Sequence, residues 1–242
     1  MKLLLASLAA LVSGAALAQT DIEAVERGTV VPSLRFSFDI AGELATGQGP
    51  AVPHSGHGIE LGLSGASGKD DQSLGGGEFV RFGNRTFTAA SPTLQHDMDF
   101  RFFEVAYRYR RFFGSGVFGI EALGGLGFAE LDLTTSSATQ SANEKMSSGG
   151  LVGGFGIVWK FLPAASLQSR LTLFGSGDEE GVTAAARLDV NIAWALARNV
   201  AVRGGLVSWG IGSSRSQTSD TSVNSRIQAG LSGLLLGLDV AF

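Results

Sequence analysis

The feature that most constrains the fold of this chain is a repeated two-residue alternation of apolar side chains. Val182 to Trp194 is the cleanest example, with an apolar residue at every second position opposed by Arg187, Asp189 and Asn191. A period of two is that of a β-strand, because successive side chains point to opposite faces of a sheet. The alternation therefore predicts two-faced strands, and nothing beyond the N-terminal region requires a helix.

The face opposite the apolar residues is unusual for a soluble protein. It carries mainly Gly and Ala with a sparse set of Arg, Asp and Glu, and Gly makes up 35 of the 242 residues, about twice its usual share of roughly 7%. Small residues suit the cramped interior of a narrow barrel, and sparse charges in such an interior must pair. The pattern predicts a barrel with apolar side chains outward in lipid. A soluble β-sandwich is the alternative fold.

The N-terminus has the composition of a secretory signal. Lys2 precedes an apolar run from Leu3 to Val12, and small residues follow up to Ala18. About ten apolar residues are too few for a helix that crosses a bilayer, which needs roughly 20. We therefore predict a cleaved signal peptide at 1–18, a periplasmic segment at 19–32 and a barrel at 33–242.

The connections between the predicted strands fall into two classes. Three are short, at 114–116, 162–166 and 196–199, and two are longer and polar, at 133–148 and 213–224. Aromatic residues gather beside the short turns: Tyr107, Tyr109, Phe112, Phe113, Trp159, Phe161, Trp194 and Phe242. Short turns beside an aromatic girdle at one end, with long loops at the other, are typical of outer-membrane barrels.

The last predicted strand has apolar residues at every second position up to a terminal Phe. These residues are Leu234, Leu236, Leu238, Val240 and Phe242. With the signal peptide and the alternating strands, this ending resembles the small bacterial outer-membrane β-barrel family, of omptin size or smaller. The resemblance covers essentially the whole mature chain. It implies a Gram-negative outer-membrane location, a terminal-strand signal read by the barrel assembly machinery, and contact with outer-membrane lipid and lipopolysaccharide.

The resemblance also bears on the number of strands. Seven strands are predicted between about Asp99 and Phe242, and two more near 33–45 and 57–67. Both termini of such barrels lie in the periplasm, which requires an even number of strands. We therefore predict a closed antiparallel up-and-down barrel of ten strands, with 78–88 as the tenth and eight strands as the alternative.

A ten-stranded barrel leaves an interior that side chains fill or nearly fill. The charged residues predicted to face this interior then form a lattice of ion pairs. They are Glu60, Glu104, Arg108, Arg110, Glu121, Arg170, Arg187, Asp189, Arg203 and Asp239. A wide diffusion porin is therefore not expected.

Residue types that carry chemistry are scarce in this chain. The absence of Cys excludes disulfides, thiolate metal sites and a Cys nucleophile. The net charge of −4 gives no support to nucleic-acid binding. We therefore expect no metal and no cofactor.

The three histidines fall in predicted loops or rims. His54 and His57, with Ser55 between them and Glu60 nearby, are the residue types of a metal cluster or of the His, Ser and acid set of an outer-membrane lipid deacylase. We interpret them as a polar surface loop. His96-Asp97 imitates the His and Asp pair of the omptin proteases. The second acidic pair of an omptin is missing from this rim, because strand counting places Asp70-Asp71 at the periplasmic end. We expect no catalytic residue.

These observations predict a barrel without an evident catalytic site and with a structural or surface-contact role. The sequence does not identify the surface ligand. Two alternatives remain. One is a narrow channel for small solutes, and the other is a rim enzyme that acts on lipid A or peptides.

Overall fold

The computed structural model describes residues 22–24, 33–42, 55–75, 79–82, 85–88, 93–177, 181–197, 199–216 and 224–241. The predicted signal peptide at 1–18 lies outside these residues, as does most of the predicted segment at 19–32. Regular secondary structure in the described residues is β throughout, as predicted. No helix in this part of the chain is long and apolar enough to cross a membrane.

The strands follow the chain in twelve segments. They are β1 (Ile22–Ala24), β2 (Ser33–Gly42), β3 (Gly56–Ser73), β4 (Phe79–Phe82), β5 (Arg85–Thr88), β6 (Thr93–Phe113), β7 (Phe118–Ser136), β8 (Ser141–Leu162), β9 (Ala165–Gly177), β10 (Gly181–Ala197), β11 (Val200–Ser216) and β12 (Asn224–Ala241).

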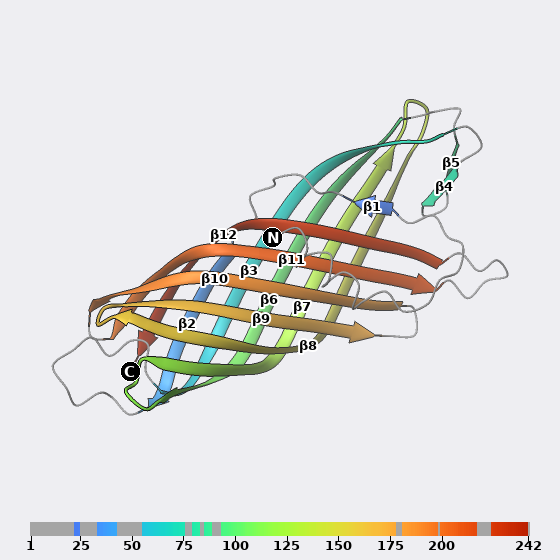
Figure 1. Ribbon diagram of the computed structural model, residues 1–242. Helices are drawn as coiled ribbons and strands as arrows, with labels where there is room; N and C mark the ends of the chain where they lie inside the picture. Colours follow the sequence, from blue (N-terminus) through green and yellow to red (C-terminus); the bar gives the residue numbers. More distant parts are fainter. Residues whose placement is uncertain are drawn as a thin grey trace.

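Nine of these strands form a closed barrel (Figure 1). The order around the wall is β2, β3, β6, β7, β8, β9, β10, β11 and β12, and β12 pairs with β2 to close it. A path that follows the cross-strand partners from strand to strand starts at Gln228 of β12 and passes once around the wall. This path returns to β12 at Leu238, ten residues further along the strand. A stagger of this size tilts the strands by about 40° from the barrel axis.

The prediction of ten antiparallel strands, with eight as the alternative, is wrong. The wall has nine strands, and its closing pair is parallel, with Ser33–Asp39 of β2 beside Leu235–Ala241 of β12. An even number requires the first and last strands to run in opposite directions, and β2 runs the same way as β12. The predicted tenth strand at 78–88 forms a separate hairpin of β4 and β5.

All three predicted short turns lie at one end of the barrel, which we call the turn end. Two occupy 114–117 and 163–164, and the third joins the end of β10 at Ala197 to the start of β11 at Val200. Gly114 and Gly116 have φ angles of 53° and 75°, a left-handed conformation that favours Gly in a tight turn. β2 also ends and β3 begins at this end, because Gly42 pairs with Gly56 there.

At the opposite end, which we call the far end, the strands continue through the predicted long loops. The predicted loop at 133–148 is the end of β7, a four-residue turn and the start of β8. The predicted loop at 213–224 likewise includes the end of β11 and the start of β12. These strands therefore extend much further toward the far end than their sequence predicted.

The polarity of the two strand faces reverses along the strands. In β6 the outward residues change from Asp99 and Arg101 to Phe103 and Val105, while the inward residues change from Phe102 to Glu104. In β7 the outward Phe128 is followed by Glu130. The barrel is therefore apolar outside and charged inside toward the turn end, and polar outside and apolar inside toward the far end.

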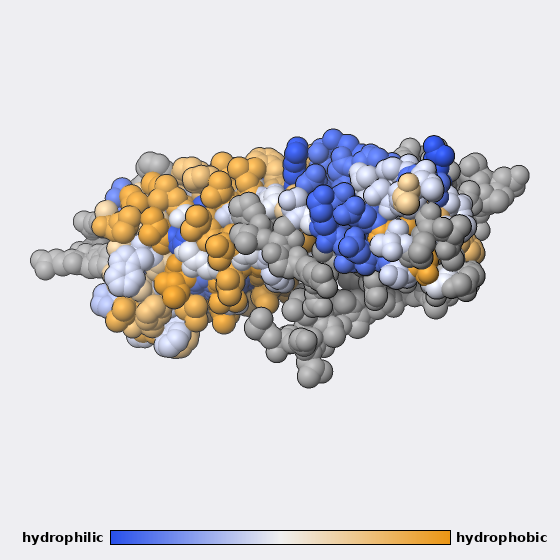
Figure 2. Space-filling model, turned by 90° about the horizontal axis from the view of Figure 1, so that it is seen from above, coloured by the Kyte–Doolittle hydropathy of each residue, from blue (hydrophilic) through white to orange (hydrophobic). Residues whose placement is uncertain are grey.

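The apolar outer zone forms a continuous belt, which Figure 2 shows as the orange part of the surface beside a blue part. Its far-end margin consists of exposed Leu34, Leu63, Phe103, Phe128, Leu151, Leu173, Leu188, Leu206 and Leu234. Its turn-end margin consists of exposed Tyr109, Phe113, Phe118, Trp159, Phe161, Trp194 and Leu196. On β6 the outward residues from Phe103 to Phe113 are apolar or aromatic except for the exposed Arg111 near the turn end. At about 3.4 Å per residue and a tilt of about 40°, this span gives a height of about 26 Å.

The far-end interior is a hydrophobic core. Leu94, Met98 and Phe100 of β6 are almost fully buried, as are Leu131 and Leu133 of β7. The β4–β5 hairpin lies near the far ends of the long strands (Figure 1) and adds the buried Val80, Phe82 and Phe87 to the same cluster. Gln140, in the turn between β7 and β8, fixes the hairpin by donating from Nε2 to the Thr86 carbonyl at 2.8 Å.

Candidate functional site

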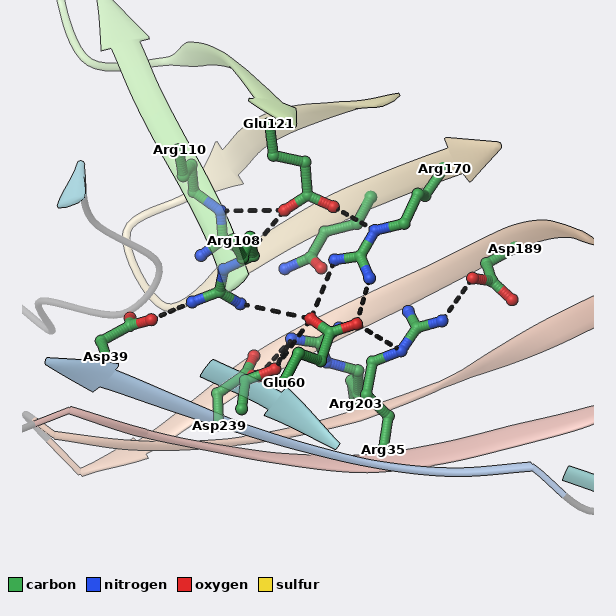
Figure 3. A network of polar contacts seen from close by, with 12 residues as sticks. Arg35, Asp39, Glu60, Arg108, Arg110, Glu121, Arg170, Asp189, Arg203 and Asp239 are labelled. Atoms are coloured by element: carbon green, nitrogen blue, oxygen red, sulfur yellow. Dashed lines mark hydrogen bonds and ion pairs between the residues drawn. The ribbon is translucent and has the colours of Figure 1, made fainter. Parts of the chain in front are cut away.

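Inside the belt, twelve charged side chains form what we call the ionic cluster. Figure 3 labels ten of them. Six of the twelve are arginines and six are carboxylates, so the cluster is formally neutral. Each is at most 5% exposed. The members are Arg35, Asp39, Glu60, Glu104, Arg108, Arg110, Glu121, Arg170, Arg187, Asp189, Arg203 and Asp239. They come from every strand of the wall except β8.

Glu60 of β3 is the centre of the ionic cluster. Its Oε1 lies 3.0 Å from Arg35 Nε, and its Oε2 lies 3.1 Å from Arg170 Nη2 and 3.7 Å from Arg108 Nη1. The Ser37 hydroxyl also donates to Glu60 Oε2 at 3.1 Å. One carboxylate therefore ties together arginines from β2, β6 and β9.

Toward the turn end, Glu121 of β7 is the second bridging carboxylate. Arg170 Nε donates to its Oε1 at 2.5 Å, and Arg110 Nη2 donates to its Oε2 at 2.9 Å. Arg108 donates to Asp39, and Arg203 donates to Asp239. The Arg170–Glu121 and Arg108–Asp39 contacts join strands that are not neighbours in the wall, whereas the other two contacts join neighbouring strands.

Toward the far end, Asp189 of β10 holds two arginines. Arg35 Nη2 donates to its Oδ2 at 2.5 Å, and Arg187 Nε lies 3.3 Å from the same oxygen. Arg187 also donates from Nη2 to Glu104 at 2.5 Å. Arg203 Nη2 donates to the Ser37 hydroxyl at 3.4 Å, and Ser37 in turn donates to Glu60. The ionic cluster is thus one connected network along the inside of the belt.

Glycines on the inner face leave room for these long side chains. A Cβ on Gly62 would collide with the Glu104 carboxylate, and a Cβ on Gly237 would lie 2.5 Å from Arg203 Cγ. Real Cβ atoms do not approach other atoms so closely, so a larger residue at either position would displace a charged side chain. This accounts for the Gly-rich inner face of the sequence.

An aromatic septum separates the ionic cluster from the far-end core. It consists of Phe100, Phe102, Phe174 and Trp209, with the Trp209 ring edge-on to Phe100 and Phe102 at centroid distances of 5.3 and 4.9 Å. Phe102 also meets Phe174 edge-on at 5.3 Å. The Arg187 guanidinium lies 5.1 Å from the Trp209 ring, a cation–π contact between the ionic cluster and the septum.

All ten residues of the predicted lattice lie in the ionic cluster, but sequence reasoning missed two members, Arg35 and Asp39. Both lie on the polar face of the predicted strand at 33–45, with alternation identical to that of the included residues. That alternation was the available signal. Phe112, which sequence reasoning placed in the outer girdle, faces inward with Lys160 Nζ 4.0 Å from its ring centroid.

The predicted assembly residues lie on the outer face of β12. Leu234 and Leu236 are exposed, Leu238 and Val240 are half-buried, and Phe242 lies outside the described residues. Their role as a signal stays a prediction.

Of the three histidines, His96 does not lie in a loop or at a rim, where the sequence predicted it. His96 is buried on β6 beyond the belt, where Nδ1 hydrogen-bonds with Thr135 Oγ1 at 2.9 Å and Nε2 with Gln72 Oε1 at 3.1 Å. Burial lowers the pKa of His96, although the nearby Asp70 and Asp71 oppose this effect. The prediction that Asp70-Asp71 lies at the opposite end from His96 is wrong, because Asp70 pairs directly with His96.

His96 nevertheless lacks the geometry of a catalytic base. Both ring nitrogens have partners and the side chain is fully buried, so neither nitrogen faces solvent. His57 lies outside the barrel near the turn end, where its Nδ1 hydrogen-bonds with the Tyr107 hydroxyl. His54 lies outside the described residues. Among the described residues, no group of three or more metal-binding side chains is found.

The arrangement therefore favours closure of the lumen over chemistry. Twelve charged side chains fill the belt section, and the aromatic septum lies across its far-end side. One cavity, lined by residues including Phe100, Leu131, Met146 and Ile211, has a volume of about 10 Å³, which is about enough for one water molecule.

No protein-family model, curated protein or solved structure matches the chain.

Proposed function

We propose that this protein is an integral outer-membrane β-barrel that does not conduct solutes and has a structural or surface-contact role. The observation that carries the proposal is the belt of exposed apolar side chains around a neutral, ion-paired interior. A soluble barrel would place the apolar side chains inside and the charges outside. The proposal explains why this part of the barrel does the reverse.

The dimensions of the belt support the proposal. Its height of about 26 Å is close to the apolar band of about 25 Å that outer-membrane barrels present to lipid. The aromatic residues of its turn-end margin, including Tyr109, Trp159 and Trp194, suit the interface between acyl chains and headgroups. Closure by β2 and β12 leaves no unpaired strand edge across most of the belt.

The two ends support an orientation. Outer-membrane barrels have short periplasmic turns, so the turn end faces the periplasm in our proposal. The far end, with its polar outer surface and apolar core, then stands outside the membrane like a small soluble domain. A rigid, water-facing extension of this kind suits contact with other molecules at the cell surface.

The structure favours this proposal over the two alternatives. A narrow channel would need a path past the ionic cluster and the aromatic septum. A rim enzyme would need a free base, whereas His96 is buried with both ring nitrogens engaged.

Membrane insertion is tested with the three tryptophans of the chain. Trp159 and Trp194 are 43% and 48% exposed on the belt, whereas Trp209 is 2% exposed inside the barrel. In vesicles of lipids brominated on their acyl chains, single-tryptophan variants that keep Trp159 or Trp194 should be strongly quenched. The variant that keeps Trp209 should be quenched weakly, because the wall separates it from lipid.

Heat-modifiable gel migration, which reports a folded barrel, serves as the control for each variant. Equal and weak quenching of all three tryptophans in folded protein would contradict insertion.

A further inference from the structure

Two cations share one carboxylate immediately beyond the far-end margin of the belt. Arg101 Nη1 lies 3.7 Å from Glu130 Oε1, and Lys145 Nζ lies 3.2 Å from the same oxygen. Arg101 is 76% exposed and Lys145 is 56% exposed. This group, which we call the basic triad, therefore carries one unit of positive charge in excess on the outer surface.

The basic triad forms the first polar layer above the belt. Arg101 and Glu130 are cross-strand partners on β6 and β7, and the next outward pair toward the turn end is Phe103 and Phe128. Two residues along a strand cover about 7 Å. An amphiphile with its acyl chains on Phe103 and Phe128 would thus have its headgroup at Arg101.

Lys145 leans toward the belt. Its direct cross-strand partner is Asp132, yet its ammonium lies against Glu130, which is nearer the belt. Asp132 instead accepts a hydrogen bond from Asn143 Nδ2 at 2.6 Å. Both cations therefore gather at the belt margin, and the carboxylates of Asp132 and Asp99 lie one layer further away.

We infer that the basic triad binds the phosphate of a phosphorylated lipid in the surrounding leaflet. The excess positive charge complements a phosphate, and the exposed Phe103 and Phe128 below it complement the acyl chains of the same molecule. Arg and Lys are the side chains that pair with phosphate oxygens. The inference rests on the proposed membrane insertion, and it names a lipid of the same membrane as the partner.

The test uses the full-length protein folded in neutral detergent micelles. Retention of a phosphorylated lipid A preparation is measured by native mass spectrometry against the same preparation after dephosphorylation. We expect preferential retention of the phosphorylated form. Arg101→Gln and Lys145→Gln should each lower that retention by about fivefold, the effect of one cation near a charged lipid surface.

Two further variants separate a site from a general charge effect. Glu130→Gln should raise retention, because it leaves two cations without their carboxylate. Lys69→Gln is the matched control: Lys69 is 73% exposed on neighbouring β3, but it pairs with Asp97 at 3.0 Å and lies further from the belt. It should leave retention unchanged.

Each outcome has a defined meaning. Equal losses in Lys69→Gln and Arg101→Gln, or equal retention of phosphorylated and dephosphorylated lipid, would overturn the inference. Displacement by inorganic phosphate at equal concentration would also overturn it, because free phosphate has no acyl chains to lie on the belt. The tryptophan quenching described above tests insertion independently, so failure of retention in an inserted barrel removes only the lipid site.

Discussion

Glu60 is the side chain on which the ionic cluster most depends, because arginines from three strands surround its carboxylate. Glu60→Gln keeps the shape and removes the charge, so Arg35, Arg108 and Arg170 lose their shared partner inside the barrel. Breaking a buried ion pair from one side costs about 3–5 kcal/mol. We expect that loss in the free energy of unfolding, measured by urea titration of the folded protein in lipid vesicles.

Glu130→Gln is the matched control for this prediction. Glu130 also lies between two cations, but these are exposed at the outer surface, where an ion pair contributes less than about 1 kcal/mol. Arg170→Gln combined with Glu60→Gln should recover part of the stability, because a neutral interior is restored. Equal losses for the two Glu substitutions would show that the ionic cluster is open to solvent.

At the scale of the element, alternation is sufficient to predict the belt half of each strand but not the far-end half. The alternation correctly predicts Phe103 and Val105 as outward residues, because a strand in contact with lipid has apolar side chains on its outer face. The inward Leu94 and Met98 belong to the same strand with the opposite polarity, so a rule of apolar side chains outward assigns that segment to a loop. The charged lattice follows from the belt pattern, which explains why its ten residues could be named from the sequence.

The direction of β2 could not be predicted in the same way. It depends on a pairing between Leu34 and Leu236, about as distant in sequence as this chain allows. No local pattern distinguishes a parallel from an antiparallel neighbour. The assumption of an even number of strands therefore led to a tenth strand at 78–88, whose apolar residues instead cover the far-end core.

The reversal of polarity predicts different effects of one substitution at two positions on β8. Ile157 is 56% exposed at the middle of the belt, and Ser147 is exposed on the same face beyond it. Ile157→Arg should lower the free energy of unfolding in vesicles by about 2–4 kcal/mol, the cost of a cation at the midplane of a bilayer. Ser147→Arg should change it by no more than about 0.5 kcal/mol. Similar small effects at both positions would mean that water surrounds the belt.

At the scale of the whole molecule, the barrel is closed by two barriers in series. The ionic cluster fills the belt section, and the aromatic septum with the core behind it fills the far-end section. Because solutes must pass both, removal of one barrier leaves the other in place. The two barriers also differ in kind, since the first repels apolar solutes and the second repels ions.

We therefore expect the wild-type protein to show no stable conductance steps in planar lipid bilayers. Phe102→Ala with Trp209→Ala thins the septum, and Glu60→Ser with Arg170→Ser removes one charge of each sign from the cluster. Each pair of substitutions alone should give no conductance, whereas the four together should give small openings. Heat-modifiable migration confirms that each variant is folded.

Stable openings of the wild type would contradict a closed lumen, and openings with the septum pair alone would show that the ionic cluster is permeable. In that case the six arginines and six carboxylates would line a conducting path, and the narrow-channel alternative would replace the structural role.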